Sequence, residues 1–494
     1  MLFKLILLPI ISILILAGIP RYALRVIKQI ALFLSLIIFV YSLYLYCIFD
    51  PYSFTYQYYQ TFLVWKGINF IIGVDGISLF FIILSTFLIP ICLLTNWTSV
   101  NYRYKEFALV LFLLEFFLIN VFSNLDFFFF YVFFEAVLIP MFIMIGIWGS
   151  RERKIHAAYQ FFLYTFIGSI LMLVSLLIIY LHVGSTSFDL IKYVGLPFEK
   201  QLFVWLALFL ALAVKVPMYP FHIWLPEAHV EAPTSGSVLL AGILLKLGTY
   251  GFIRILLPLF PYALVYFKPF VFMLLLVSIL YGSFATLRQI DLKKIIAYSS
   301  IVHMNFALLG LFTNSIEGIQ GSFFIMLSHG IVSSALFFSI GVLYDRYHTR
   351  ILAYYGGLVQ FMPIFSLIFL IFILSNMGFP GSSSFVGEIL VLIAIVNFNE
   401  QVGIISSLSM LFGAIYSIWL YNRIIFGELR LYNYFYNKNN FLLIYKANWM
   451  LKFMDITKRE FFIFLPLCFL NFLLGIYPSC ILNYTYISAL HLLI

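Results

Sequence analysis

The chain has 494 residues, of which 64% are hydrophobic and only 10% are charged. Roughly a quarter of the residues in a water-soluble fold are charged, so this composition excludes a soluble protein and makes the lipid bilayer the solvent. The net charge of +9 comes from basic connections between apolar segments, and it indicates contact with lipid headgroups rather than nucleic-acid binding.

Apolar runs of about 20 residues, which is the length that crosses a bilayer as a helix, recur along the whole sequence. They predict an all-α polytopic membrane protein of about 14 transmembrane helices with short polar connections. The predicted spans are 2–19, 29–49, 74–95, 107–122, 125–148, 157–182, 202–218 with a short continuation at 221–231, 235–258, 264–286, 290–312, 319–343, 359–396 in two parts, 403–426 and 461–478.

Helix breakers interrupt the seventh and the twelfth of these spans. Pro217 and Pro220 follow Lys215 in the seventh, and the glycines and proline of 378–381 precede Glu388 in the twelfth. Proline removes a backbone donor and clashes with the preceding turn, so each span is expected to split into two half-helices. Paired breaks five spans apart indicate an inverted repeat, with the working site where the breaks occur.

The sequence thus predicts one integral membrane domain, 1–494, in four parts. These are three N-terminal helices in 1–106, a first repeat of helices 4–8 in 107–258, a second repeat of helices 9–13 in 259–427, and a surface connection with helix 14 in 428–494. The basic, aromatic tract 428–460 fits equally well a segment lying on the membrane surface and a solvated loop that touches a partner subunit.

The positions of Lys and Arg predict how the chain sits in the membrane. An even number of spans places both termini on one face, and basic residues concentrate in connections of the opposite face, for example 151–154, 288–294 and 346–350. The positive-inside rule assigns this richer face to the cytoplasm or the mitochondrial matrix.

Several ionisable side chains lie too deep in the predicted spans to reach either membrane surface. Lys246, for example, is roughly 17 Å from both ends of its helix at 1.5 Å per residue, whereas Arg254 lies near a span end and is expected to extend to the interface. A charge stranded in lipid costs at least about 2.5–3.5 kcal/mol, so the deep groups must face the bundle interior. The set is Glu135, Lys215, Lys246, His303, His329 and Glu388.

These deep groups favour a proton-transfer role. A buried ion pair that fixes helix packing explains any one of them, but buried pairs are seldom net stabilisers, so a whole series is hard to explain by packing. Moving Glu135 relative to Lys215 would switch the lysine between holding and releasing a proton. Carrying one charge against roughly 170 mV costs about 4 kcal/mol, which equals a pKa change of about three.

Other polar side chains near the breaks and the mid-membrane histidines are expected to support this relay. They are His222, Glu227, His229, Ser299, Ser300 and Ser328. The histidines and glutamates of 222–231 lack HExxH spacing, and the four cysteines form no CxxC pair. No metal site and no cofactor site are therefore predicted in this chain.

Long blocks between residues 73 and 427 resemble the subunit 4 branch of the antiporter-like membrane subunits of respiratory complex I. Among them are "FFYVFFEAVLIPMFIMIGIWGS", "FHIWLPEAHVEAPTSGSVLLAGILLKLGTYGFIR", "TLRQIDLKKIIAYSSIVHMNFALLG" and "PGSSSFVGEILVL". The resemblance implies an antiporter-like fold of 14 helices, standing beside similar subunits in the membrane arm of NADH:ubiquinone oxidoreductase. Each such subunit is thought to move a proton, driven by quinone reduction elsewhere in the complex.

The resemblance also implies partners, cofactors and location. The expected partners are antiporter-like subunits 2 and 5, accessory subunits and phospholipids. The chain is expected to bind no cofactor itself, while the complex as a whole uses FMN, iron–sulfur clusters and ubiquinone. The expected location is the mitochondrial inner membrane, with both termini on the intermembrane-space side.

By motif, the resemblance gives roles to the deep groups. Glu135 in "FFEAVLIP" matches the essential fifth-helix glutamate and Lys215 the lysine paired with it; Lys246 in "LLKLG" matches the central lysine. His303 and His329 match histidines of the central hydrophilic axis, and Glu388 in "FVGE" matches the acid that subunit 4 uses where its sister subunits use lysine. A subunit of a multi-subunit cation/proton antiporter and an inactive membrane scaffold remain as alternatives.

Overall fold

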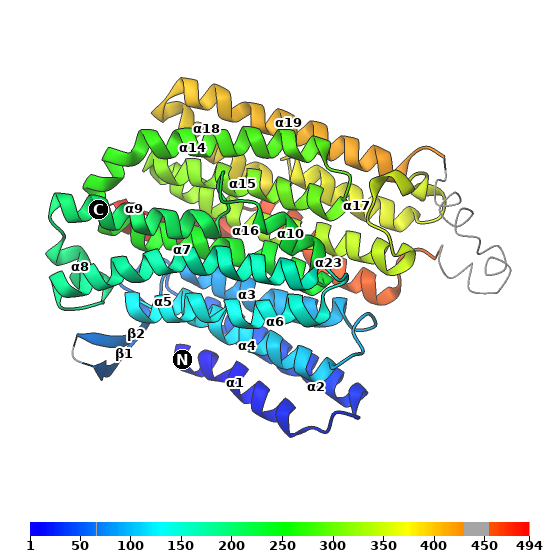
Figure 1. Ribbon diagram of the computed structural model, residues 1–494, viewed down its shortest axis with the longest axis horizontal. Coiled ribbons are helices and arrows are strands. Elements are labelled where there is room, and N and C mark those ends of the chain that lie inside the picture. The colour runs from blue at the N-terminus through cyan, green and yellow to red at the C-terminus, as the bar shows by residue number, and fades with distance from the viewer. Residues whose placement is uncertain (66, 429–453, 494) are drawn as a thin grey trace.

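Long helices lying nearly side by side dominate the computed structural model, which describes residues 1–65, 67–428 and 454–493 (Figure 1). A chain in a bilayer must satisfy its backbone hydrogen bonds within each segment, and helices do so. In the described part of the chain, 11 helical segments are long and apolar enough to cross a membrane, and three shorter apolar helices accompany them. The exact number of 14 spans therefore stays a prediction.

Helices occupy every predicted span. In the first half of the chain they are α1 (Leu2–Gly18), α2 (Leu24–Ile48), α3 (Gly76–Thr95), α4 (Tyr104–Ser123), α5 (Phe127–Ala136), α6 (Leu138–Trp148), α7 (Lys154–Val183), the short α8 (Phe188–Val194), α9 (Phe198–Lys215) and α10 (Trp224–Glu231). In the second half they are α14 (Pro261–Arg288), α15 (Leu292–Thr313), α16 (Ile316–Tyr347), α17 (Pro363–Asn376), α18 (Ser383–Phe398), α19 (Glu400–Ile425), α23 (Lys458–Ile476) and α24 (Ser479–Leu493).

Both predicted helix breaks are confirmed. The first separates α9 from α10, and its backbone is held by two hydrogen bonds: Trp224 Nε1 donates to the Val214 carbonyl at 2.9 Å, and the Tyr219 N–H donates to Ser278 Oγ at 2.9 Å. The second separates α17 from α18. Gly378 and Gly381 occupy it with φ of +74° and +88°, a left-handed conformation that glycine adopts without a steric penalty.

The eighth span is continuous but irregular, which the sequence did not predict. It alternates between α-helix and the wider π-helix through α11 (Thr234–Leu239), η1 (Leu240–Leu244), α12 (Leu245–Gly251), η2 (Phe252–Leu256) and α13 (Leu257–Leu259). π-helical turns are rare and often occur at functional sites. Here one of them ends at Leu244, two residues before Lys246.

Several short elements and one further helix lie outside the predicted spans. Strands β1 (Gln57–Trp65) and β2 (Ile68–Val74) form an antiparallel hairpin between α2 and α3. Helix α24 follows α23, and Ser488 Oγ on α24 accepts a hydrogen bond from the Gly76 N–H at the start of α3. Two short 3₁₀ turns, η3 (Leu352–Tyr354) and η4 (Leu358–Gln360), connect α16 to α17.

Helix α16 positions the site because its central part, 321–343, is buried and the helix packs against α15, α18 and the η1 turn of the eighth span. Both chain ends lie toward the end of the bundle that carries the β-hairpin (Figure 1). The predicted tract 428–460 lies largely outside the described residues. The inverted repeat of 107–258 and 259–427 stays a prediction.

Candidate functional site

Lys246 and His329 form a direct contact at the centre of the bundle. Lys246 on α12 is fully buried, and its Nζ donates to the Ala241 carbonyl in the η1 turn at 2.5 Å. The same Nζ lies 2.7 Å from Nδ1 of His329 on α16, a hydrogen bond whose donor depends on the protonation of the lysine and the tautomer of the histidine. No carboxylate among the described residues forms an ion pair with Lys246.

His303 continues the line from His329 toward the second helix break. The two imidazole rings, on α15 and α16, have centroids 5.9 Å apart. His303 Nδ1 lies 3.4 Å from Glu388 Oε1 on α18, while its Nε2 is buried and has no hydrogen-bond partner among the residues described. A cavity of about 10 Å³, lined by His303, Glu388 and Asn376 among others, has room for about one water molecule.

The backbone of the second break shapes the surroundings of Glu388. A side chain at Gly378 would collide with the Glu388 carboxylate. The glycine therefore serves two purposes, because it allows a positive φ and leaves room for the carboxylate beside the unwound segment.

Glu135 and Lys215 form a second cluster in the first half of the chain. Glu135 lies in the last turn of α5, just before Val137 separates α5 from α6, and its Oε1 atom is buried without a hydrogen-bond partner among the described residues. Lys215 ends α9, and its Nζ lies 4.5 Å from the centre of the Phe134 ring, a cation–π distance. The two charges attract each other, but they form no ion pair within 4.0 Å in the described structure.

The two clusters meet through the backbone of α12. A Cβ added to Gly248, two residues after Lys246, would lie 3.1 Å from Lys215 Cβ. The six predicted residues therefore occupy two neighbouring groups, Glu135 with Lys215, and Lys246 with His329, His303 and Glu388. The structure shows no direct side-chain contact between Lys215 and Lys246.

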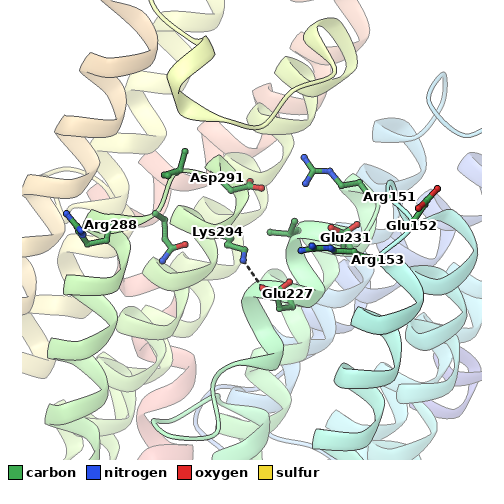
Figure 2. Close-up of a pocket in the computed structure, with 11 residues that line it drawn as sticks. Arg151, Glu152, Arg153, Glu227, Glu231, Arg288, Asp291 and Lys294 are labelled. Carbon is green, nitrogen blue, oxygen red and sulfur yellow. Dashed lines mark hydrogen bonds and ion pairs between the residues drawn. The ribbon is translucent and has the colours of Figure 1, made fainter.

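The polar residues that were expected to support the relay lie in different surroundings. The hydroxyls of Ser299, Ser300 and Ser328 each donate to carbonyls of their own helices, at 2.8, 3.0 and 3.1 Å, and not to the histidines. Glu227, in the first turn of α10, forms an ion pair of 2.7 Å with Lys294 (Figure 2).

His222 and His229 are both buried. His222 packs against the rings of Tyr219 and Tyr281 near the first break. His229 stacks on Phe337 with ring centroids 4.5 Å apart. Within the described ranges, no group of three His, Cys, Asp or Glu residues could hold a metal ion.

Arg254 is buried in a pair with an acidic residue at a helix end. The residue is only 4% exposed, and its guanidinium forms an ion pair of 2.8 Å with Asp75, the N-cap of α3. The Nε atom also donates to Tyr250 Oη at 3.2 Å.

Two basic residues that the sequence assigned to surface connections are buried as well. Lys293 is 3% exposed and Arg350 is fully buried; Arg350 donates to the Val230 carbonyl and to Ser150 Oγ. Position near a helix end suggested exposure in both cases, but packing of distant connections covers them. In the sequence, the one feature that could have indicated burial of these basic residues is that acidic residues such as Asp291 lie close by.

Comparison with known proteins agrees with this geometry. Residues 124–413, more than half of the chain, match the family described as NADH:quinone oxidoreductase/Mrp antiporter, TM. The chain belongs to this family. The proteins named NADH-ubiquinone oxidoreductase chain 4 from Chondrus crispus and Marchantia polymorpha are 52% and 51% identical to it, over 98% and 99% of this chain and 96% of each relative.

Solved structures show the same fold. A chain of respiratory complex I from Thermus thermophilus is 26% identical, with a TM-score of 0.84 over 99% of this chain and 100% of that one. A chain of the Mrp complex from Dietzia is 18% identical, with a TM-score of 0.84 over 99% and 97%, and it shows the fold alone. The predicted antiporter-like fold and the resemblance to the subunit 4 branch of complex I are confirmed, and the chain is an antiporter-like membrane subunit of that kind.

Proposed function

We propose that the chain moves a proton across the mitochondrial inner membrane within the membrane arm of NADH:ubiquinone oxidoreductase. Glu135, Lys215, Lys246, the two histidines and Glu388 hold the proton in turn, and quinone reduction elsewhere in the complex supplies the energy. In this proposal both termini face the intermembrane space, and antiporter-like subunits 2 and 5 are the neighbours.

The observation that carries the proposal is the line of buried titratable groups from Lys246 to Glu388. Lys246 Nζ lies 2.7 Å from His329 Nδ1, and the ring centroids of His329 and His303 are 5.9 Å apart. His303 Nδ1 lies 3.4 Å from Glu388 Oε1. Proton transfer needs donor and acceptor within hydrogen-bond reach or linked by one water. The contact between Lys246 and His329 meets this condition. The contact of 3.4 Å between His303 and Glu388 is slightly longer than hydrogen-bond reach, and in this proposal one water bridges it and one water bridges the gap between the two rings.

The Glu135–Lys215 pair suits a switch because its charges attract without being locked together. Two unit charges about 4 Å apart interact by about 4 kcal/mol at an effective dielectric constant of about 20. Moving one charge against about 170 mV costs about 4 kcal/mol. Closing and opening this pair is therefore strong enough to drive one proton against the membrane potential.

The test is the number of protons moved per NADH oxidised by the assembled complex in lipid vesicles carrying Glu135→Gln. The amide keeps the shape of the side chain and cannot hold a proton, so the ratio should fall while the complex still assembles. Glu317→Gln, on an exposed first-turn glutamate of α16, is the matched control and should keep the wild-type ratio. An unchanged ratio in Glu135→Gln would instead support a membrane scaffold.

A further inference from the structure

One asparagine outside the relay joins the two half-helices of the second break. Asn471 is fully buried on α23, a helix that packs against α16, α17 and α18. Its Oδ1 atom accepts from the Ser383 hydroxyl at 2.8 Å and from the Ser383 N–H at 3.3 Å. Its Nδ2 atom donates to Ser375 Oγ at 2.7 Å. Ser375 lies in the last turn of α17 and Ser383 is the first residue of α18, so a single amide group bonds to both half-helices.

The neighbouring hydrogen bonds determine which way the Asn471 amide points. The Ser375 hydroxyl donates its own proton to the Ile371 carbonyl at 2.7 Å, so Ser375 Oγ can only accept from Asn471. The amide nitrogen therefore faces α17, and the amide oxygen faces the two donors of Ser383 on α18. Exchanging the two ends of the amide would place its nitrogen against the Ser383 N–H, which cannot accept a hydrogen bond.

Asn471 also provides a cap that α18 lacks. The first N–H groups of a helix have no partner within that helix, and the N-cap residue of α18, Ser382, makes no side-chain capping bond. The bond from the Ser383 N–H to Asn471 satisfies one of these groups from another helix. A buried N–H without a partner is costly, so this amide helps to fix the place where α18 begins.

A backbone contact one turn further along α23 fixes the distance between this helix and the break. A Cβ added to Gly475 would collide with the Gly381 carbonyl and with the backbone of Ser382. The absence of a side chain at Gly475 lets the two backbones touch. Asn471 lies four residues earlier on the same helix and is thereby held within hydrogen-bond reach of both half-helices.

We propose that Asn471 is a positioning residue for the proton step between His303 and Glu388; this inference rests on the proposed function. Glu388 lies five residues after Ser383 on α18, so its carboxylate moves with the beginning of that half-helix. His303 Nδ1 and Glu388 Oε1 are 3.4 Å apart, at the long limit for a hydrogen bond, and a small displacement weakens the contact. Asn471 acts through Ser375 and Ser383, by keeping the two half-helices at one separation.

The test measures protons moved per NADH by the assembled complex in vesicles, with Glu135→Gln as the reference. Asn471→Leu keeps the approximate size of the side chain and removes its hydrogen bonds, so the ratio should fall toward the level of Glu135→Gln. Asn120→Leu is the matched control, because Asn120 is also fully buried and its amide donates to the Phe116 carbonyl of its own helix at 2.8 Å. It should keep the wild-type ratio.

Two further variants separate positioning from packing. Asn471→Asp, measured at mildly acidic pH, carries a carboxylic acid of the same shape, whose carbonyl oxygen accepts and whose O–H donates as the amide does. It should restore the ratio that Asn471→Leu loses. The double variant Ser375→Ala with Ser383→Ala removes both partner hydroxyls and should lower the ratio with Asn471 in place, which decides the matter even if Asn471→Leu does not assemble.

The outcomes separate the two proposals. If Glu135→Gln lowers the ratio and either Asn471→Leu or the double serine variant keeps it at wild type, the positioning role is wrong and the proposed function stands. Equal losses in Asn471→Leu and Asn120→Leu, or no rescue by Asn471→Asp, would also overturn the positioning role. If Glu135→Gln itself keeps the wild-type ratio, the proposed function fails and the positioning role falls with it.

Discussion

Replacing Gly378 by alanine should separate Glu388 from His303 without removing either group. The new Cβ would collide with the Glu388 carboxylate, which must move by more than about 1 Å to reach ordinary carbon–oxygen separations. The present distance from Glu388 Oε1 to His303 Nδ1 is already 3.4 Å, at the long limit for a hydrogen bond, so a displacement of this size changes both the separation and the alignment of the two groups. A misplacement of about 1 Å can slow a positioned step about 100-fold.

The backbone conformation adds a second, separate effect. A left-handed φ costs a non-glycine residue about 1–2 kcal/mol, so Gly378→Ala should also lower thermal stability. Gly381→Ala is the matched control, because Gly381 has a φ of +88° and nothing within 4 Å of its added Cβ. It carries the same backbone strain without displacing Glu388.

The assay is again the number of protons moved per NADH by assembled complex, together with the temperature of thermal inactivation. Both variants should inactivate at a similarly lower temperature, and only Gly378→Ala should lose proton translocation. Equal losses in the two variants, or a wild-type ratio in Gly378→Ala, would refute the placement of Glu388 in the relay.

Two further predictions concern stability and the supporting serines. Asp75→Asn removes the charged partner of the buried Arg254 guanidinium and should destabilise the subunit by about 3–5 kcal/mol, which is measured as a lower thermal denaturation midpoint. Glu106→Gln is the control, because it breaks a more exposed pair with Arg21 and should cost at most about 1 kcal/mol. Equal shifts would contradict the burial argument. The triple replacement of Ser299, Ser300 and Ser328 by alanine should leave protons per NADH unchanged, because these hydroxyls bond to their own helices; a lower ratio would place them in the relay.

The sequence predicted those parts of the structure that depend on local chemistry. Apolar runs locate the helices because the bilayer requires a minimum apolar length. Proline and glycine marked both breaks, and mid-span position identified the deep Lys, Glu and His groups. The distance of Lys246 from both helix ends sufficed to predict that it faces the bundle interior.

Features that depend on tertiary packing were not predicted. The π-helical turns around Lys246 have no local signal, and the β-hairpin of 57–74 looked like a connection between two spans. Arg254, Lys293 and Arg350 lie near helix ends, where a long side chain usually reaches water, and distant segments cover them. The contact between His303 and Glu388 joins two helices 85 positions apart in sequence, a pairing that one sequence cannot specify.

The most direct test of the account is Lys246→Met in fully assembled complex. Methionine fills a similar volume and removes a fully buried charge, so assembly and thermal stability should be kept or improved. If buried ionisable groups carry the proton, the number of protons moved per NADH falls in this variant. A wild-type ratio with Lys246→Met would show that these groups only hold helices together, and it would contradict the central claim.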